Sequence, residues 1–228
     1  MPAPSLDGTT VLGEAINTSG THTFASGKTT TGSNRLGLVA IGGVSFGTSG
    51  VSGVTWNGVA MTLVDQLKPD MAASLWYIVN PPTSSSTVAI TFDGLWQGYG
   101  IVSSFQDVNQ TTPIGTAAKT SGTGETASLT VSSASGETVV DALGCYPNVP
   151  TVGAGQTVIG SVGSSSGGDR WGAHSYEAGA ASVSMGWSGA GITVWSIVGV
   201  SLKAVVDPTN EFAINTLRPM IFAPGLAR

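Results

Sequence analysis

The sequence predicts an all-β protein, with two antiparallel sheets packed face to face through jelly-roll or Greek-key connections and an extended C-terminal arm. Charged residues make up only 9% of the 228 residues, whereas Gly alone contributes 33, so the charged faces of solvated helices are missing. Turn residues recur about every eight to twelve positions, as in sandwiches and barrels. Hydrophobic residues at 41% supply enough apolar surface for a core.

The first strands are bounded by Gly, Asn and Ser. Residues 9–16 and 21–24 are expected to form a short opening pair. Residues 35–44 are apolar on both faces apart from their glycines, which is typical of a buried central strand. Residues 54–64 are predicted to form a tight hairpin, because Asn57-Gly58 permits the positive φ angles of a type I′ turn.

A second group of strands begins at residues 73–79, where Pro81 and Pro82 then prevent further pairing because they lack backbone donors. In residues 87–92, apolar and small polar side chains alternate, as in a half-buried strand. The other strands are expected at 98–108, 127–131, 138–146, 156–162, 170–176, 181–187 and 193–206. None of these segments keeps a helical period.

No charge run or long linker divides the chain before its end, so residues 1–206 are interpreted as one sandwich domain. Residues 207–228 differ, because Pro219 and Pro224 exclude a continuous helix or a central strand. Left in water, the apolar side chains of this arm would form an adhesive patch, so we expect it to bind its own sandwich or another subunit. The expected partner-binding residues are Phe212, Ile214, Leu217, Met220, Ile221, Phe222 and Leu226.

Charge and composition argue against several classes of function. The net charge is −5 and the eight Lys and Arg residues are scattered, so neither a nucleic acid nor an anionic membrane is an expected partner. The single cysteine, Cys145, cannot form an internal disulfide, and the first residues lack the pattern of a secretory signal. One cysteine, two histidines and dispersed acids predict no metal site, and no cofactor is expected.

Patterns that could carry catalysis are weak, and we expect no catalytic residue and no enzyme. The Gly-x-Ser-x-Gly matches at 43–47 and 163–167 are expected by chance in a chain so rich in Gly and Ser. In residues 169–177, strand alternation places His174 and Ser175 on opposite faces, which argues against a Ser-His-acid triad. This segment is interpreted as a strand with one solvated face or as a polar and aromatic binding face.

Four of the six tryptophans fall into two groups. Trp56, Trp76 and Trp195 lie among alternating apolar residues and are expected in the core. Trp96 lies in the loop-like segment 93–99, so Trp96 and Tyr99 are the candidates for stacking on a sugar ring.

Several segments together resemble a β-sandwich module that recurs in tailed-phage virion proteins and in repetitive bacterial surface proteins. The resemblance covers about residues 9–204 and depends on turn and core residues. The last residues, RPMIFAPGLAR at 218–228, are also similar to short C-terminal tails of phage structural proteins. The matching segments are SNRL at 33–36, VTWNGVAMTLV at 54–64, LWYIVNPP at 75–82, DVNQTTPIG at 107–115 and GAGQT at 153–157.

The resemblance implies a non-catalytic capsid decoration or cement protein, or another virion surface component, assembled in the host cytoplasm. Its expected partner is another virion protein such as the major capsid protein, bound through the arm and the sandwich edges. Edge strands with few charges also favour a homo-oligomer. The alternative is a carbohydrate-binding module on a tail fibre or cell surface, which would use Trp96 and Tyr99. The sequence leaves open whether the location is head or tail.

Overall fold

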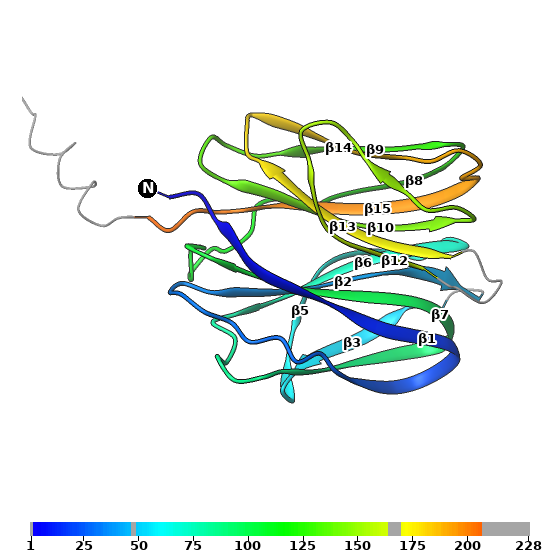
Figure 1. Ribbon diagram of the computed structural model, residues 1–228, viewed down its shortest axis with the longest axis horizontal. Coiled ribbons are helices and arrows are strands. Elements are labelled where there is room, and N and C mark those ends of the chain that lie inside the picture. Colours follow the sequence, from blue (N-terminus) through cyan, green and yellow to red (C-terminus); the bar gives the residue numbers. More distant parts are fainter. Residues whose placement is uncertain (1, 47–48, 164–169, 207–228) are drawn as a thin grey trace, which may run out of the picture.

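The computed structural model describes residues 2–46, 49–163 and 170–206, and it confirms the predicted all-β, antiparallel sandwich fold. The described residues contain no helix and form fifteen strands in three sheets, whereas two sheets were predicted (Figure 1). Seven strands belong to the first half of the chain and eight to the second half, so each half builds its own sheets. We call residues 5–106 the first half and residues 118–202 the second half.

The first half forms one seven-stranded sheet, in which β4, β3, β7, β2, β6 and β5 are neighbours in that order and β1 pairs with β7. The bounds of its strands are β1 Ser5–Ala25, β2 Leu36–Ser45, β3 Val51–Trp56, β4 Val59–Ala60, β5 Thr62–Leu67, β6 Met71–Val79 and β7 Thr87–Gln106.

The second half forms a five-stranded sheet in the order β12-β13-β10-β15-β8 and a three-stranded sheet in the order β11-β14-β9. The bounds of its strands are β8 Ala118–Thr123, β9 Thr126–Ser132, β10 Thr138–Tyr146, β11 Thr151–Val152, β12 Thr157–Gly163, β13 Trp171–Ala178, β14 Ser182–Ser188 and β15 Val194–Leu202.

The two long strands, β1 and β7, fold the first sheet over on itself. β1 pairs with β7 along nearly its whole length, whereas β3 pairs with residues 88–92 of β7 and β2 pairs with residues 96–105. The prediction that each long strand would be two short ones is therefore wrong. Asp93-Gly94 looks like a turn locally, yet the pairing with β1 continues beyond it and bulges absorb the bend.

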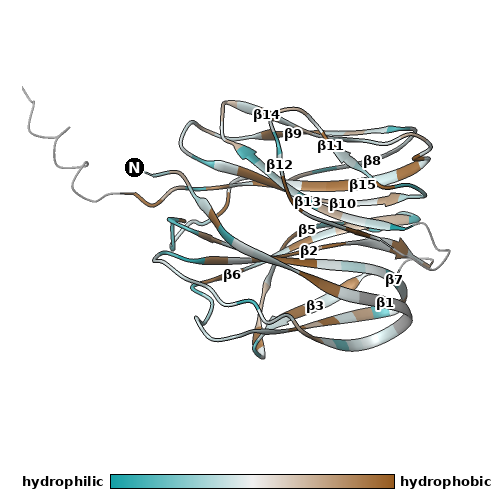
Figure 2. Cartoon of the chain, in the orientation of Figure 1, coloured by the Kyte–Doolittle hydropathy of each residue, from teal (hydrophilic) through white to brown (hydrophobic). Residues whose placement is uncertain are grey.

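Three hydrophobic cores lie between the stacked layers. The first lies inside the folded sheet, around Trp56, Ile41 and Phe92. The second joins the two halves, where β2 and β6 pack against β10, β13 and β15, and the third lies between the five- and three-stranded sheets. Figure 2 shows the corresponding hydrophobic stretches along β2, β3 and β15.

Local predictions from short patterns hold well. Asn57 and Gly58 both have positive φ, at 48° and 79°, and Trp56 pairs with Val59, so the predicted tight turn is confirmed. The hairpin itself is shorter than the predicted 54–64, because residues 62–64 belong to β5, which pairs with β6. β2 is buried and lies between β6 and β7, which confirms the predicted central strand. Trp76 and Trp195 are buried in the core, as predicted.

The molecule has two distinct ends. At the end that we call the terminus end, Thr138 pairs with Leu202 and donates a hydrogen bond to the carbonyl of Pro4 (2.6 Å), and the described chain leaves after residue 206. At the opposite, distal end, Tyr146 pairs with Val194. β10 and β15 run between these ends (Figure 1).

Candidate functional site

A chain of buried polar side chains crosses the interface between the halves. We call Ser103, Asp141, His174, Ser175 and Trp187 the buried relay. Ser103 Oγ in β7 lies 2.9 Å from His174 Nε2 in β13, and His174 Nδ1 is hydrogen-bonded to the backbone carbonyl of Asp141 in β10. Because a carbonyl only accepts, Nδ1 carries the proton, and Nε2 accepts the Ser103 hydroxyl. The relay therefore links the first sheet to the five-stranded sheet.

The carboxylate of Asp141 extends the relay to the three-stranded sheet. Its Oδ2 accepts the indole N–H of Trp187 in β14 (2.6 Å), and its Oδ1 accepts the Ser175 backbone N–H (2.7 Å) and hydroxyl (3.0 Å). Gln156 completes the arrangement, because its Nε2 donates to Ser175 Oγ (2.7 Å) and its Oε1 accepts the Gly186 N–H (2.6 Å). One polar network thus joins the three sheets that the described residues form.

Burial shifts both titratable groups of the relay toward their neutral forms. It raises the pKa of Asp141 to about 7, although hydrogen bonds from Trp187 and Ser175 favour the carboxylate. It lowers the pKa of His174 to about 4, although the hydrogen bond to the Asp141 carbonyl opposes this shift. His174 is therefore a neutral imidazole at physiological pH.

The Ser103–His174 pair has the spacing of a nucleophile and its base, but its setting is structural. Both side chains are 0% exposed, so a substrate has no access to the hydroxyl in this conformation. The Asp141 carboxylate accepts from Ser175 and Trp187, whereas His174 is hydrogen-bonded to the backbone carbonyl of Asp141 and not to its carboxylate. The arrangement satisfies buried polar groups and fixes the three sheets relative to one another.

These contacts correct the interpretation of residues 169–177 as a strand with a solvated face. The predicted alternation holds, because His174 contacts the first sheet while Ser175 contacts Asp141 and Gln156. The predicted exposure is wrong, because both residues are buried. Sequence reasoning also missed Asp141 as a structural acid, and its signal was one carboxylate within the otherwise apolar segment VVDALGC.

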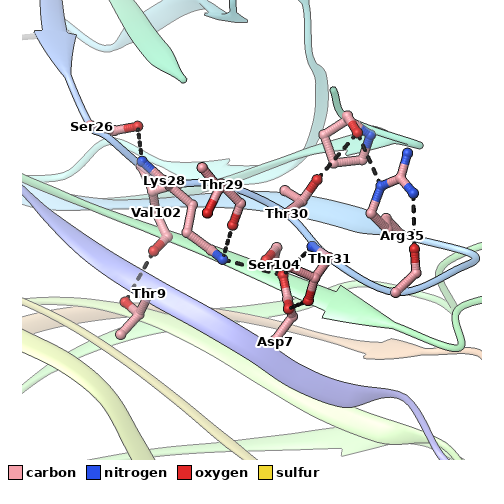
Figure 3. Close-up of polar contacts among 12 residues, drawn as sticks. Asp7, Thr9, Ser26, Lys28, Thr29, Thr30, Thr31, Arg35, Val102 and Ser104 are labelled. Carbon is pink, nitrogen blue, oxygen red and sulfur yellow. Dashed lines mark hydrogen bonds and ion pairs between the residues drawn. The ribbon is translucent and has the colours of Figure 1, made fainter. Parts of the chain in front are cut away.

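A second polar cluster fixes the segment between β1 and β2 (Figure 3). The Asp7 carboxylate accepts hydrogen bonds from Ser104 Oγ (2.6 Å) and the Thr31 N–H (3.0 Å), and it pairs with the ammonium of Lys28 (3.2 Å). Both charged side chains are nearly buried. Burial disfavours the charged form of Asp7, but the hydrogen bonds from Ser104, Thr31 and Lys28 outweigh it and hold its pKa well below the usual range.

The structure corrects the candidate sugar-stacking pair. Segment 93–99 is part of β7 and not a loop, and Trp96 and Tyr99 are only 0% and 3% exposed. The Trp96 ring stacks on Phe92, with centroids 5.4 Å apart. Neither ring presents a face to solvent, so the predicted stacking surface at these two residues is wrong.

A small open pocket lies at the distal end, where the first sheet meets the five-stranded sheet. We call it the seam pocket, and its volume is about 190 Å³. Arg170 beside it donates from Nη1 to Gln97 Oε1 (2.6 Å), and its guanidinium carbon lies 6.0 Å from the centroid of the Phe46 ring. The lining residues are Val44, Asp70, Met71, Tyr146, Arg170 and Val194.

The remaining candidate features are a metal site, the single cysteine and a membrane span. Within residues 2–46, 49–163 and 170–206, no group of three or more His, Cys, Asp or Glu side chains is placed to hold a metal ion. Cys145 is a free, buried thiol, and burial raises its pKa to about 12. The described part of the chain has no helix that could cross a membrane.

The predicted partner-binding residues lie outside the described part of the chain, and their role stays a prediction. These residues are Phe212, Ile214, Leu217, Met220, Ile221, Phe222 and Leu226. Comparison of the chain with protein-family models, with curated proteins and with solved structures found no match.

Proposed function

We propose that this chain is a capsid decoration protein, a non-catalytic virion component that binds the shell through residues 207–228 and through its sandwich edges. The observation that carries the proposal is the position of residue 206, from which residues 207–228 continue. The described chain ends at residue 206 beside the N-terminal strand, at one end of a molecule whose strands run toward the other end (Figure 1). This geometry suits an anchor at one pole and a free surface at the other.

The origin of residues 207–228 is fixed by backbone hydrogen bonds. The Lys203 N–H donates to the Pro113 carbonyl (2.9 Å), and the Val205 N–H donates to the Asp107 carbonyl (3.0 Å). Residues 203–205 therefore leave the sandwich in a defined direction. The seven apolar side chains that follow need cover from water, which a partner surface supplies.

An open depression beside this exit offers a place for contact. Its volume is about 610 Å³, and it is formed by three segments that meet at the terminus end. Its lining combines backbone-rich turns with one acid and one base, Glu137 and Lys203. A partner that covers the exit would bury these polar groups together with the first residues of the arm.

The test is a truncation after Val206, made in the virus genome that encodes the chain. The truncated protein should keep the thermal unfolding temperature of the full chain, because every described core lies before residue 207. Mass spectrometry of purified particles should show its loss from the particle. A full-length variant with Phe212, Ile221 and Phe222 changed to Ser should be lost in the same way.

The matched control changes Thr209 and Thr216 to Ala in the same segment and should be incorporated normally. The proposal fails if truncated protein with an unchanged unfolding temperature is present in particles at the wild-type amount. It fails equally if purified particles contain none of the wild-type chain.

A further inference from the structure

The seam pocket has mainly aliphatic walls, and its rim carries both a donor, Arg170, and an acceptor, Asp70. Val44 lies next to the last residue of β2, Met71 begins β6 and Val194 begins β15, so three strands from two sheets form the apolar walls. Ser196 holds the two sheets together beneath it, because its hydroxyl donates to the Met71 carbonyl (2.7 Å). The walls therefore belong to the rigid framework.

The size of the pocket limits its ligand to one small ring or side chain. Pockets for drug-sized ligands have volumes of about 300–1,000 Å³, and the seam pocket, at about 190 Å³, is smaller. It is open to solvent at the distal end, at the ends of β2 and β10. A longer ligand can therefore place one unit in the pocket and continue outward.

The charges on the rim favour a ligand with no net charge. Asp70 is an exposed carboxylate and Arg170 a half-buried guanidinium, and within the described part of the chain neither takes part in an ion pair. An anionic ligand would meet Asp70, and a cationic ligand would meet Arg170. Together the two groups accept from and donate to hydroxyls, and the bond from Arg170 to Gln97 fixes the donor in place.

The aromatic residue of the pocket supplies the remaining recognition element. Tyr146 lines the pocket and is 41% exposed, unlike the buried Trp96 and Tyr99. An exposed tyrosine combines an apolar ring face with a polar hydroxyl. A ligand with an apolar ring face and several hydroxyls, small and uncharged, matches every group that lines the pocket.

We propose that the seam pocket binds one neutral saccharide residue, packed against Tyr146 and the aliphatic walls and hydrogen-bonded to Asp70 and Arg170. This site lies at the end opposite the proposed anchor, and the proposal does not depend on the role of residues 207–228. A protein anchored at the terminus end would present this pocket outward.

The test uses the full chain and a panel of methyl glycosides of neutral hexoses, pentoses and N-acetylhexosamines. Saturation-transfer NMR should show binding of at least one glycoside, and titration should give its affinity. Tyr146→Ala and Asp70→Asn should each weaken that affinity at least tenfold. Asp70→Asn keeps the size of the side chain but replaces the charged carboxylate by a neutral amide with one acceptor oxygen, so it tests the charge-assisted hydrogen bond without opening the pocket.

The matched control is Leu95→Ala, which removes a similarly exposed apolar side chain at the same end without touching the pocket. It should bind the glycoside as the wild type does. Thermal unfolding of all three variants shows that each is folded. The proposal is overturned if no glycoside binds, if Tyr146→Ala binds as tightly as the wild type, or if only peptides or charged ligands occupy the pocket.

Discussion

Asp141 shows how one residue can determine the relation between layers. Its carboxylate is the shared acceptor for the Trp187 indole and the Ser175 backbone, which come from different sheets. Replacement by alanine would deprive three buried donors of this acceptor, namely the Trp187 indole N–H and the N–H and hydroxyl of Ser175, and each unsatisfied donor costs about 1–3 kcal/mol. Asp141 therefore holds the five-stranded and three-stranded sheets together.

The pH dependence of stability should separate Asp141 from His174. For Asp141, the pKa is 3.8 in the unfolded chain and about 7 in the folded one, so folding binds a proton and stability falls as pH rises through this window. For His174, the pKa is 6.5 unfolded and about 4 folded, so stability rises as pH rises from about 4 to 6.5. The two contributions oppose each other in the wild type.

Two variants should therefore diverge from the wild type in opposite directions between pH 4 and 6.5. Relative to the wild type, Asp141→Asn should gain free energy of unfolding as pH rises, and His174→Gln should lose it. Urea denaturation at several pH values measures both differences. Parallel curves for the two variants would contradict the assigned protonation states.

At the scale of elements, glycines let the two halves approach closely. A Cβ atom at Gly42 in β2 would lie 2.2 Å from the Leu143 carbonyl oxygen and 2.9 Å from Gly172 Cα in the facing sheet. A Cβ at Gly144 in β10 would lie 2.2 Å from the Ala72 carbonyl oxygen. Backbone meets backbone here, so no side chain can move aside to make room.

Gly42→Ala should therefore destabilise the protein by about 1–3 kcal/mol, the usual cost of overpacking, or more where the layers cannot separate. The control is Gly53→Ala in β3, where no heavy atom lies within 4 Å of the added Cβ and the effect should stay within about 0.5 kcal/mol. Chemical denaturation measures both. Equal effects at the two positions would refute the close approach.

Elements with local signals could be predicted, and those set by distant pairing could not. Asn57-Gly58 fixed its hairpin through the conformations of two adjacent residues. The continuity of β7 past Asp93-Gly94 depends on β1, about seventy residues earlier in the chain, and no local pattern reveals it. The predicted strand break at 93–97 also placed Trp96 and Tyr99 in an exposed loop. Both residues lie in β7 and are buried, so the candidate sugar site was wrong.

At the scale of the whole molecule, the second core couples the halves. Leu36, Leu38 and Leu75 of the first half pack with Val140, Val198 and Val200 of the second, and all six are fully buried. The partners of Asp141 in the relay are likewise distant, since Trp187 lies 46 residues along the chain. Such contacts follow from the stacking of three sheets, whereas the sequence predicted only two packed face to face.

The halves should consequently unfold together. Fluorine-labelled tryptophan places three probes in each half: Trp56, Trp76 and Trp96, and Trp171, Trp187 and Trp195. Their resonances should lose native intensity at one common urea concentration. Separate midpoints for the two sets would show that the second core does not couple the halves.

The direction of β15 has a mechanical consequence. This strand lies between β10 and β8, and the chain continues from its last residue, Leu202, to residue 206. Tension applied there acts along the strand, so the hydrogen bonds to both neighbours share the load at once and do not open one by one. A molecule held by this end would therefore be loaded in shear, along β15, and not by peeling the strand away from its neighbours.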